Sequence, residues 1–353
     1  MKTSSPLPFI LQALLAAIFF GVSAPIAKFL LGDNISPIFL AAFLYLGSGT
    51  GTFLVRLTQR MRTKETEADI KLPDVKWLAG AIISGGIIAP IILMVSLQYT
   101  PASTASLLLN FEGVGTTLIA LVFFKEAISR RAWTAILVIT LASIFLSANL
   151  KSGFGFSLGA LGIILACMLW GLDNNFTRNI SGKDPLAIVA WKGLVAGTFS
   201  FFLALFLGNS LPSLTNIIYT LLLGFISYGL STMLFIRSMR GLGAARTSAL
   251  YGTAPLAGVL LSIVIFGEIP SFLFIVATVL MVGGALLLIN EHHSHTHVHT
   301  ALIHEHSHSH KDLSHAHDDA NVDGIHSHEH EHPAEEHEHD HMPDIHHRHG
   351  HEE

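Results

Sequence analysis

Charged residues are scarce in this chain. They make up 13% of its 353 residues, and hydrophobic residues make up 51%, whereas a soluble globular domain carries about 25% charged residues. This deficit argues against a surface that faces water throughout. The single cysteine, Cys167, excludes an internal disulfide. The sequence shows no phosphate-binding loop and no catalytic grouping, so we expect neither ATP-driven transport nor an enzyme.

Histidine is absent before His292, although the chain contains 22 histidines. Residues 291–353 hold all of them, together with 15 of the 25 acidic residues, but only two basic ones, Lys311 and Arg348. Counting histidine as neutral, this tail carries −13 and residues 1–290 carry +8. The basic residues of the first part sit singly between apolar runs, so the sequence predicts no nucleic-acid partner.

Long apolar runs fill residues 1–290 almost back to back. About 20 mostly apolar residues are needed to cross the hydrocarbon core as a helix, and helices are expected because backbone groups in lipid must be satisfied internally. The sequence therefore predicts an all-α integral membrane protein with ten transmembrane helices. The predicted spans are 8–30, 37–57, 77–97, 102–124, 133–149, 157–177, 185–207, 215–237, 245–266 and 270–290.

Lysine and arginine are distributed unevenly between the predicted connections. With a cytoplasmic N-terminus, 15 basic residues lie inside, Lys28 and Lys151 lie outside, and Lys192 lies within a span. Because basic residues favour cytoplasmic loops, we expect both termini in the cytoplasm. Pro25, Pro90 and Pro255 lie inside the spans and predict kinks.

The two halves of the hydrophobic part resemble each other. Thr104–Asn149 aligns with Arg246–Asn290 at a shift of 142 residues. Ala16–Lys28 aligns more weakly with Ala166–Arg178. Each half holds five spans, and an odd number inverts the second copy relative to the first, which is typical of secondary transporters. We therefore predict two inverted five-helix repeats, residues 1–150 and 151–290, followed by the tail, residues 291–353.

Several short motifs recur in order in both halves. They are the Trp170-Gly171 region of the sixth span, the small-residue starts at 101–106 and 244–249, and the endings Phe124-Lys125-Glu126 and Phe266-Gly267-Glu268. With these motifs the chain resembles the drug/metabolite transporter superfamily, and within it the ten-helix EamA-type permeases, over residues 8–290. The resemblance implies secondary transport of metabolites, amino acids or drugs in the plasma membrane of a prokaryote.

Polar residues inside the spans are the candidates for a substrate pathway, because charge at a helix centre is costly and needs a reason. In the sixth span, Trp170, Asp173 and Asn174 lie on one helix face, and Asn175 follows. Lys192 of the seventh span could pair with the Asp173 carboxylate or extend to the membrane surface instead. Glu112, the deepest carboxylate, suits proton coupling; its alternative is a structural hydrogen bond. Glu126 and Glu268 end equivalent spans and are expected to be structural. The candidate pathway residues are Trp170, Asp173, Asn174, Asn175, Lys192, Asn110 and Glu112.

The tail alternates histidine with acidic and small residues. Its polar, low-complexity composition predicts disorder, and neutral imidazole is a ligand for Zn, Ni, Co or Cu. A pH-responsive tail and drift of a simple repeat are the alternatives. The candidate ligands are His292, His293, His295, His297, His299, His304, His306, His308, His310, His326, His328, His330, His332, His337, His339, His341, His346, His347, His349 and His351.

Two parts of such different composition leave three functions open. The first is an exporter of metabolites, amino acids or drugs that needs no cofactor for transport. Its cytoplasmic tail binds or senses divalent metal. The second is a Zn, Ni or Co transporter whose tail collects its cargo, and the third is a membrane-anchored metal store. The lack of histidine among the spans favours the first. The expected partners are the lipid bilayer, a small-molecule or ion substrate and a second copy of the chain.

Overall fold

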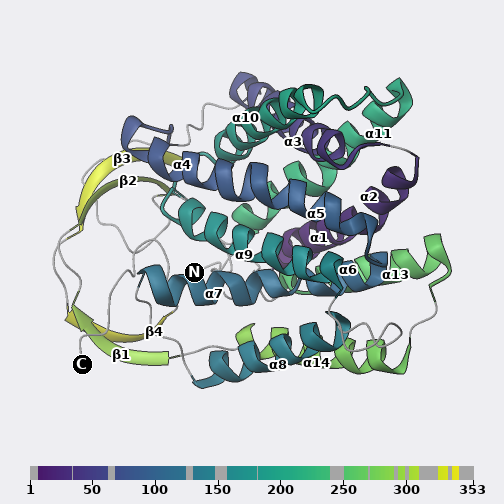
Figure 1. Cartoon of the computed structure of the whole chain (residues 1–353). Helices are drawn as coiled ribbons and strands as arrows, with labels where there is room; N and C mark the ends of the chain where they lie inside the picture. The colour runs from purple at the N-terminus through teal and green to yellow at the C-terminus, as the bar shows by residue number, and fades with distance from the viewer. Residues whose placement is uncertain are drawn as a thin grey trace.

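The apolar runs form helices packed side by side in a computed structural model of the chain (Figure 1). The structure describes residues 7–33, 35–62, 68–124, 130–147, 157–180, 182–238, 250–268 and 271–289, and four short stretches of the tail. Among these residues, seven helical segments are long and apolar enough to cross a membrane. Three shorter apolar helices, Trp133–Ala142, Ala254–Phe266 and Phe272–Gly284, accompany them. The predicted helical membrane architecture with ten spans is thereby confirmed.

Each predicted span corresponds to one helix or to two or three helical segments that follow each other. The first half contains α1 (Leu7–Gly21), α2 (Ser23–Gly32), α3 (Pro37–Arg62), η1 (Leu72–Asp74), α4 (Val75–Ala81), η2 (Ile82–Ile88), α5 (Ala89–Gln98), α6 (Ala102–Leu108), α7 (Phe111–Phe124) and α8 (Arg130–Ser147). The second half contains α9 (Leu158–Arg178), α10 (Pro185–Phe206), α11 (Leu214–Leu223), η3 (Gly224–Leu230), a helical continuation over 231–238, α13 (Ala254–Phe266) and α14 (Phe272–Ile289).

Irregular backbone recurs at matching places in the two halves. The third and eighth spans each contain a π-helical turn, η2 and η3. The fourth span breaks at Leu109–Asn110, and its counterpart has a turn at Gly252–Thr253. A proline follows closely at two of these places, Pro90 after η2 and Pro255 after the Gly252–Thr253 turn, and Pro25 likewise follows the turn at Val22 between α1 and α2. Proline lacks the backbone N–H that would continue the helix, so the predicted kinks occur as helix breaks.

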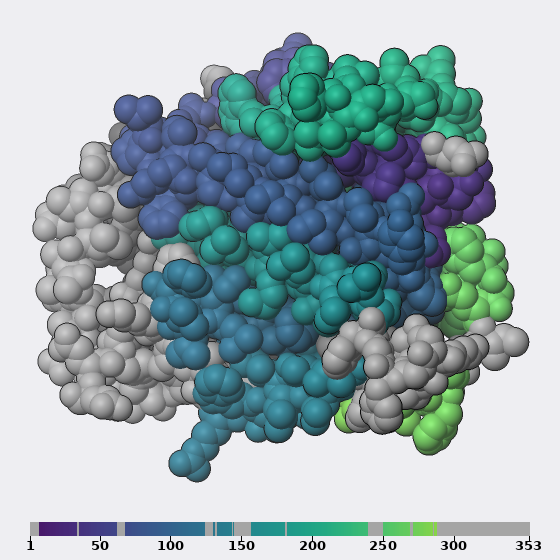
Figure 2. Space-filling model, viewed as in Figure 1, coloured from purple at the N-terminus to yellow at the C-terminus, as the bar shows by residue number. Residues whose placement is uncertain are grey.

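Helices from the two halves pack against each other along their lengths. The main neighbours are α3 with α10, α7 with α9, and α8 with α14. Figure 2 shows α10 along one edge of the molecule and α8 along the opposite edge. Large apolar side chains such as Phe206 and Phe272 are more than 80% exposed, while alanine and glycine are frequent inside. This arrangement suits helices that approach closely within lipid.

Short stretches of the tail are described as strands, and its overall disorder stays a prediction. The structure describes four strands in it, β1 (His293–Val298), β2 (Leu302–Ser309), β3 (Ile325–His332) and β4 (Glu336–His341). β1 pairs with β4 and β2 with β3, both antiparallel. The physical reason is the two-residue alternation of the sequence, which is the period of a β-strand. The low complexity of the tail obscured this period at the sequence level.

Candidate functional site

An ion pair lies at the centre of the helices. Lys192 of α10 donates a short hydrogen bond to Oδ2 of Asp173 on α9. The Asp173 side chain is 4% exposed and that of Lys192 is 20% exposed. Thr177, one turn along α9, donates to the other carboxylate oxygen at 3.0 Å. Of the two alternatives left open by the sequence, pairing and extension of Lys192 to the membrane surface, the structure has the pairing, and neither charge is left alone in an apolar setting.

The backbone of the π-helix η2 lies directly against this ion pair. A Cβ at Gly85 would overlap the Asp173 carboxylate, so only glycine fits there. The Gly85 carbonyl accepts hydrogen bonds from Tyr45 Oη at 2.6 Å and from Trp170 Nε1 at 3.0 Å. A π-helical turn frees backbone carbonyls from the regular α-helical ladder and is frequent at functional sites. The two aromatic rings are thus anchored by their polar atoms beside the ion pair.

A second polar group joins α7 to α9. Asn174 Nδ2 donates to Glu112 Oε1 at 2.8 Å and to Thr116 Oγ1 at 3.2 Å. The helices come close because Gly115 and Gly171 face each other, and a Cβ at Gly171 would overlap the Gly115 backbone. Glu112 is in the first turn of α7, where the helix dipole favours negative charge. The break before α7 thus creates a suitable place for a carboxylate in mid-span.

The other two amides of the predicted pathway have different positions. Asn175 is buried, and its Nδ2 donates to the carbonyls of Thr116 at 3.0 Å and Gly171 at 2.8 Å. The bond to Thr116 joins α9 to α7, whereas the bond to Gly171 lies within α9, so the position of Asn175 fits a structural role. Asn110 lies in the turn between α6 and α7, and not in the middle of a continuous helix as the spacing predicted.

Charge links the ion pair to the Glu112 group. The carboxyl of Glu112 interacts electrostatically with both Asp173 and Lys192. Five of the seven predicted pathway residues, Trp170, Asp173, Asn174, Lys192 and Glu112, therefore belong to one neighbourhood formed by η2, α7, α9 and α10. We call Asp173, Lys192, Glu112 and Asn174 the central polar cluster.

Aromatic rings from both halves extend this neighbourhood. Phe20 of α1 lies 6.1 Å from the Trp170 ring, 6.0 Å from Tyr228 and 5.5 Å from Tyr251, measured between ring centroids. Tyr45 lies 5.6 Å from Tyr228. Sequence reasoning missed Phe20, Tyr45, Tyr228 and Tyr251 as site residues. The sequence offered one signal for these residues, the small number of tyrosines: the chain has only five, and three of them lie here.

The predicted structural glutamates are only partly described. Glu268 accepts hydrogen bonds from the backbone N–H groups of Ala102 and Ser103, both at 3.1 Å. It therefore caps the first turn of α6 from the loop between α13 and α14. Nearby, Lys28 donates to the carbonyls of Leu97 at 2.8 Å and Thr100 at 2.5 Å. Glu126 lies outside the described residues.

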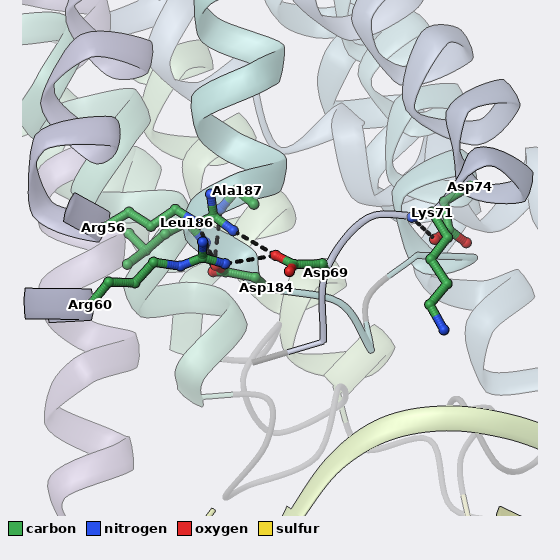
Figure 3. Close-up of polar contacts among 8 residues, drawn as sticks. All are labelled: Arg56, Arg60, Asp69, Lys71, Asp74, Asp184, Leu186 and Ala187. Atoms are coloured by element: carbon green, nitrogen blue, oxygen red, sulfur yellow. Dashed lines mark hydrogen bonds and ion pairs between the residues drawn. The ribbon is translucent and has the colours of Figure 1, made fainter. Parts of the chain in front are cut away.

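A group of ion pairs ties the end of α3 to the start of α10 (Figure 3). Arg56 Nε donates to Asp184 Oδ2 at 2.6 Å, and Arg56 and Arg60 both pair with Asp69, at 3.0 and 2.7 Å. Asp184 also accepts from the backbone N–H groups of Leu186 and Ala187 and so caps α10. This Arg56 network, Arg56, Arg60, Asp69 and Asp184, was not anticipated from the sequence.

Metal-ligating residues do not gather inside the helices. Among the side chains that the structure describes between residues 7 and 289, no three His, Cys, Asp or Glu residues are arranged to hold a metal ion. Of the predicted tail ligands, thirteen lie on the four strands. The remaining ones, His292, His299, His310, His346, His347, His349 and His351, lie outside the described residues.

Comparison with known proteins decides the family. Residues 7–148 and 157–290 each match the EamA-like transporter family. The chain belongs to the EamA-like transporter family. An uncharacterized transporter of Methanothermobacter thermautotrophicus is 28% identical over 289 residues, which are 77% of this chain and 83% of that protein. A crystal structure that shares 20% sequence identity covers 78% of this chain and 94% of its own, with a TM-score of 0.59, and shows the same fold.

Membership in the EamA-like family confirms several predictions at once. The two matched segments correspond to the two predicted repeats, and the chain is a multi-pass membrane transporter and not an enzyme. EamA-like transport needs no cofactor, and it implies the lipid bilayer and a small-molecule substrate as partners.

Proposed function

We propose that this EamA-like protein is a secondary exporter of small amine-bearing metabolites, with amino acids as the first candidates, and that the central polar cluster binds the substrate. The observation that carries the proposal is the Asp173–Lys192 ion pair beside the Glu112–Asn174 pair. One ammonium and two carboxyl groups, together with an amide, complement a molecule that bears both an amine and a carboxylate. The ring faces of Phe20 and Trp170 complement its apolar part and its amine.

The same cluster offers a means of proton coupling. Glu112 lies at a helix start in mid-span and is half-buried, and intramembrane carboxyl groups serve as proton relays in transporters. We propose that Glu112 exchanges a proton for substrate. The Asn174 amide can donate to Glu112 in either protonation state, so it orients the carboxyl group throughout the cycle.

Transition-metal transport fits the cluster less well. The Lys192 ammonium occupies the Asp173 carboxylate, and a positive charge at that position repels a metal cation. The carboxylates are the ligands preferred by hard cations, whereas Zn, Ni and Cu favour imidazole and thiolate. We therefore assign metal to the tail, as a sensor or buffer, and not to the transport pathway.

The uneven distribution of basic residues supports a defined orientation. We propose that both termini face the cytoplasm of a prokaryotic cell and that the protein resides in its plasma membrane, because basic residues concentrate on the connections of that side. A second copy of the chain as a partner stays a prediction.

Transport by proteoliposomes tests the proposal. Purified protein would be reconstituted and supplied with a panel of radiolabelled amino acids, simple amines and simple carboxylates under an imposed pH gradient. We expect flux of at least one amine-bearing compound, lost in Lys192→Met and retained in a lipid-facing control, Phe206→Leu. Zinc flux, with none of the panel transported, would overturn the proposal in favour of a metal transporter.

A further inference from the structure

The turn between α5 and α6 is held by two charged side chains from other parts of the chain. Lys28 of α2 donates to the carbonyls of Leu97 at 2.8 Å and Thr100 at 2.5 Å, where α5 ends. Glu268 accepts from the two backbone N–H groups that begin α6. A cation at the last carbonyls of one helix and a carboxylate at the first N–H groups of the next both complement the helix dipoles. We call Lys28 and Glu268 the turn clamp.

The turn clamp draws on both halves of the chain. Lys28 lies in the first segment that matches the EamA-like family, residues 7–148, and Glu268 lies in the second, residues 157–290. The turn that they hold belongs to the first segment. The hairpin of α5 and α6 can therefore move away from α2 only by giving up the Lys28 contacts, and away from the end of α13 only by giving up the Glu268 contacts.

Tight packing continues from the turn clamp toward the central polar cluster. A Cβ at Gly159, in the first turn of α9, would overlap Thr100 Oγ1, and a Cβ at Gly258 of α13 would overlap Ser106 Oγ of α6. Leu108, at the end of α6, is fully buried. The helices α5, α6, α9 and α13 thus close this end of the bundle.

The central polar cluster is open on another side. Asn174 is exposed, and its hydrogen-bond partner Glu112 is half-buried. Polar groups that face lipid find no hydrogen-bond partners there and are costly. The exposed side of this pair therefore suits an aqueous path that leads away from the turn clamp, toward the end of the bundle where α14 passes into the tail.

We propose that the turn clamp is the gate of the transporter at its end of the bundle. While Lys28 and Glu268 hold the turn, the central polar cluster is closed to that side of the membrane, and release of the turn opens it. The inference rests on the proposed binding of substrate at the cluster. In the clamped state the cluster accepts substrate from the side where the tail begins, as an exporter with a cytoplasmic tail requires.

The chemistry of the turn clamp suits contacts that are made and broken in each cycle. Both charges bind backbone groups at the end of the bundle, where water can replace either partner. The ion pair of Asp173 and Lys192 lies among the helices, where no such replacement is at hand. The clamp can therefore open without leaving a buried charge unpaired.

Cys167 is a natural reporter of this gate. It is the single cysteine of the chain and is fully buried. Its Sγ donates to the carbonyl of Leu108 at 3.5 Å, at the end of α6. On α9 it lies between Gly159, which touches the clamped turn, and Asn174 of the cluster. Movement of α6 away from α9 therefore exposes the Cys167 thiol to the clamp side of the membrane.

Labelling of Cys167 tests the gate. The full-length protein would be placed in vesicles of both orientations and treated with a membrane-impermeant maleimide. We expect Lys28→Met and Glu268→Ala each to be labelled at least about tenfold faster than the wild type from the side opposite the tail, because each loses hydrogen bonds to a charged group. Lys76→Met is the matched control, since Lys76 lies at the opposite end of the bundle, 5.0 Å from the Trp77 ring centroid. It should be labelled as slowly as the wild type.

The side of labelling separates a gate from a general loss of packing. Labelling that rises equally from both sides of the membrane, or that stays at the wild-type rate in both clamp variants, would overturn the proposal. The measurement needs no substrate. Flux of the amine-bearing panel with unchanged labelling of the clamp variants would reject the gate and leave the proposed transport function intact, whereas one-sided labelling without any flux would reject only the proposed substrate.

Discussion

Asp173 and Lys192 each lower the free-energy cost of burying the other's charge among the membrane-spanning helices. Two buried opposite charges offset much of their desolvation cost, whereas a single one left behind costs about 3–5 kcal/mol. The stability of this region therefore depends on both residues at once.

We expect Asp173→Asn alone and Lys192→Met alone to lower the thermal unfolding temperature of the detergent-solubilised protein. The double variant should be more stable than either single one, because no unpaired charge remains. Thermal unfolding followed by intrinsic tryptophan fluorescence checks this. A double variant as unstable as the sum of the two single variants would argue that the two charges do not pair.

Glu112 is predicted to set the pH dependence of transport. Glu112→Gln keeps the size of the side chain and can still bond to Asn174, but it cannot exchange a proton. We expect pH-driven flux to fall about a hundredfold, at the lower end of what proton-transfer groups contribute, while substrate counterflow without a pH gradient persists. If the Glu112→Gln variant inserts normally and its pH-driven flux equals that of the wild type, proton coupling through this residue is rejected.

At the level of the helices, close approach depends on individual glycines. Gly284 of α14 faces α8, and a Cβ there would lie 2.5 Å from Ile139 Cγ1 and 3.3 Å from the Ala135 carbonyl oxygen. Its neighbour Gly283 has no atom within 4 Å of the same added group. The two positions share a helix and a residue type, and only one of them contacts a partner helix.

Gly284→Ala should therefore destabilise the protein, because forced overpacking costs about 1–3 kcal/mol. Gly283→Ala should be neutral or stabilising, since alanine favours a helix over glycine by about 1 kcal/mol. Comparing the unfolding temperatures of the two variants checks the packing of α8 on α14. Equal effects at both positions would contradict it.

Asp184, at the start of α10, has two roles that can be tested separately. Asp184 caps the helix and also pairs with Arg56. Asparagine caps nearly as well as aspartate, so Asp184→Asn removes only the ion pair, whereas Asp184→Ala removes both interactions. We expect the alanine variant to be less stable than the asparagine variant by about 1 kcal/mol, the usual value of an N-cap. Equal stabilities, measured by chemical denaturation, would show that the cap contributes nothing here.

At the scale of the whole molecule, polar connections hold the helix ends together at two separate places. The Arg56 network links α3 with α10, and Glu268 with Lys28 links α6, α2 and the loop after α13. The central polar cluster belongs to neither. A transporter that alternates its access must release contacts at one end while keeping those at the other, so these two groups are the natural places for such a change.

Sequence patterns predicted the features that depend on local composition. Apolar runs indicated the ten spans, and the spacing of Asp173 and Lys192 around a short connection indicated that the two could pair. Features that depend on tertiary contact were not predictable in this way. Tyr45, Phe20 and Tyr228 come from three different helices and meet only when the bundle forms. The strand register of the tail likewise pairs residues far apart in sequence.

The nested pairing of the tail determines how far it extends from the membrane. β4 returns to β1, so His341 lies opposite His293, four residues after the end of α14 at Ile289. A segment held only at its start would sample a wide volume, whereas this pairing brings His341 back beside His293. A fluorophore attached at position 341 should therefore report on events at the bilayer surface and not in bulk solvent.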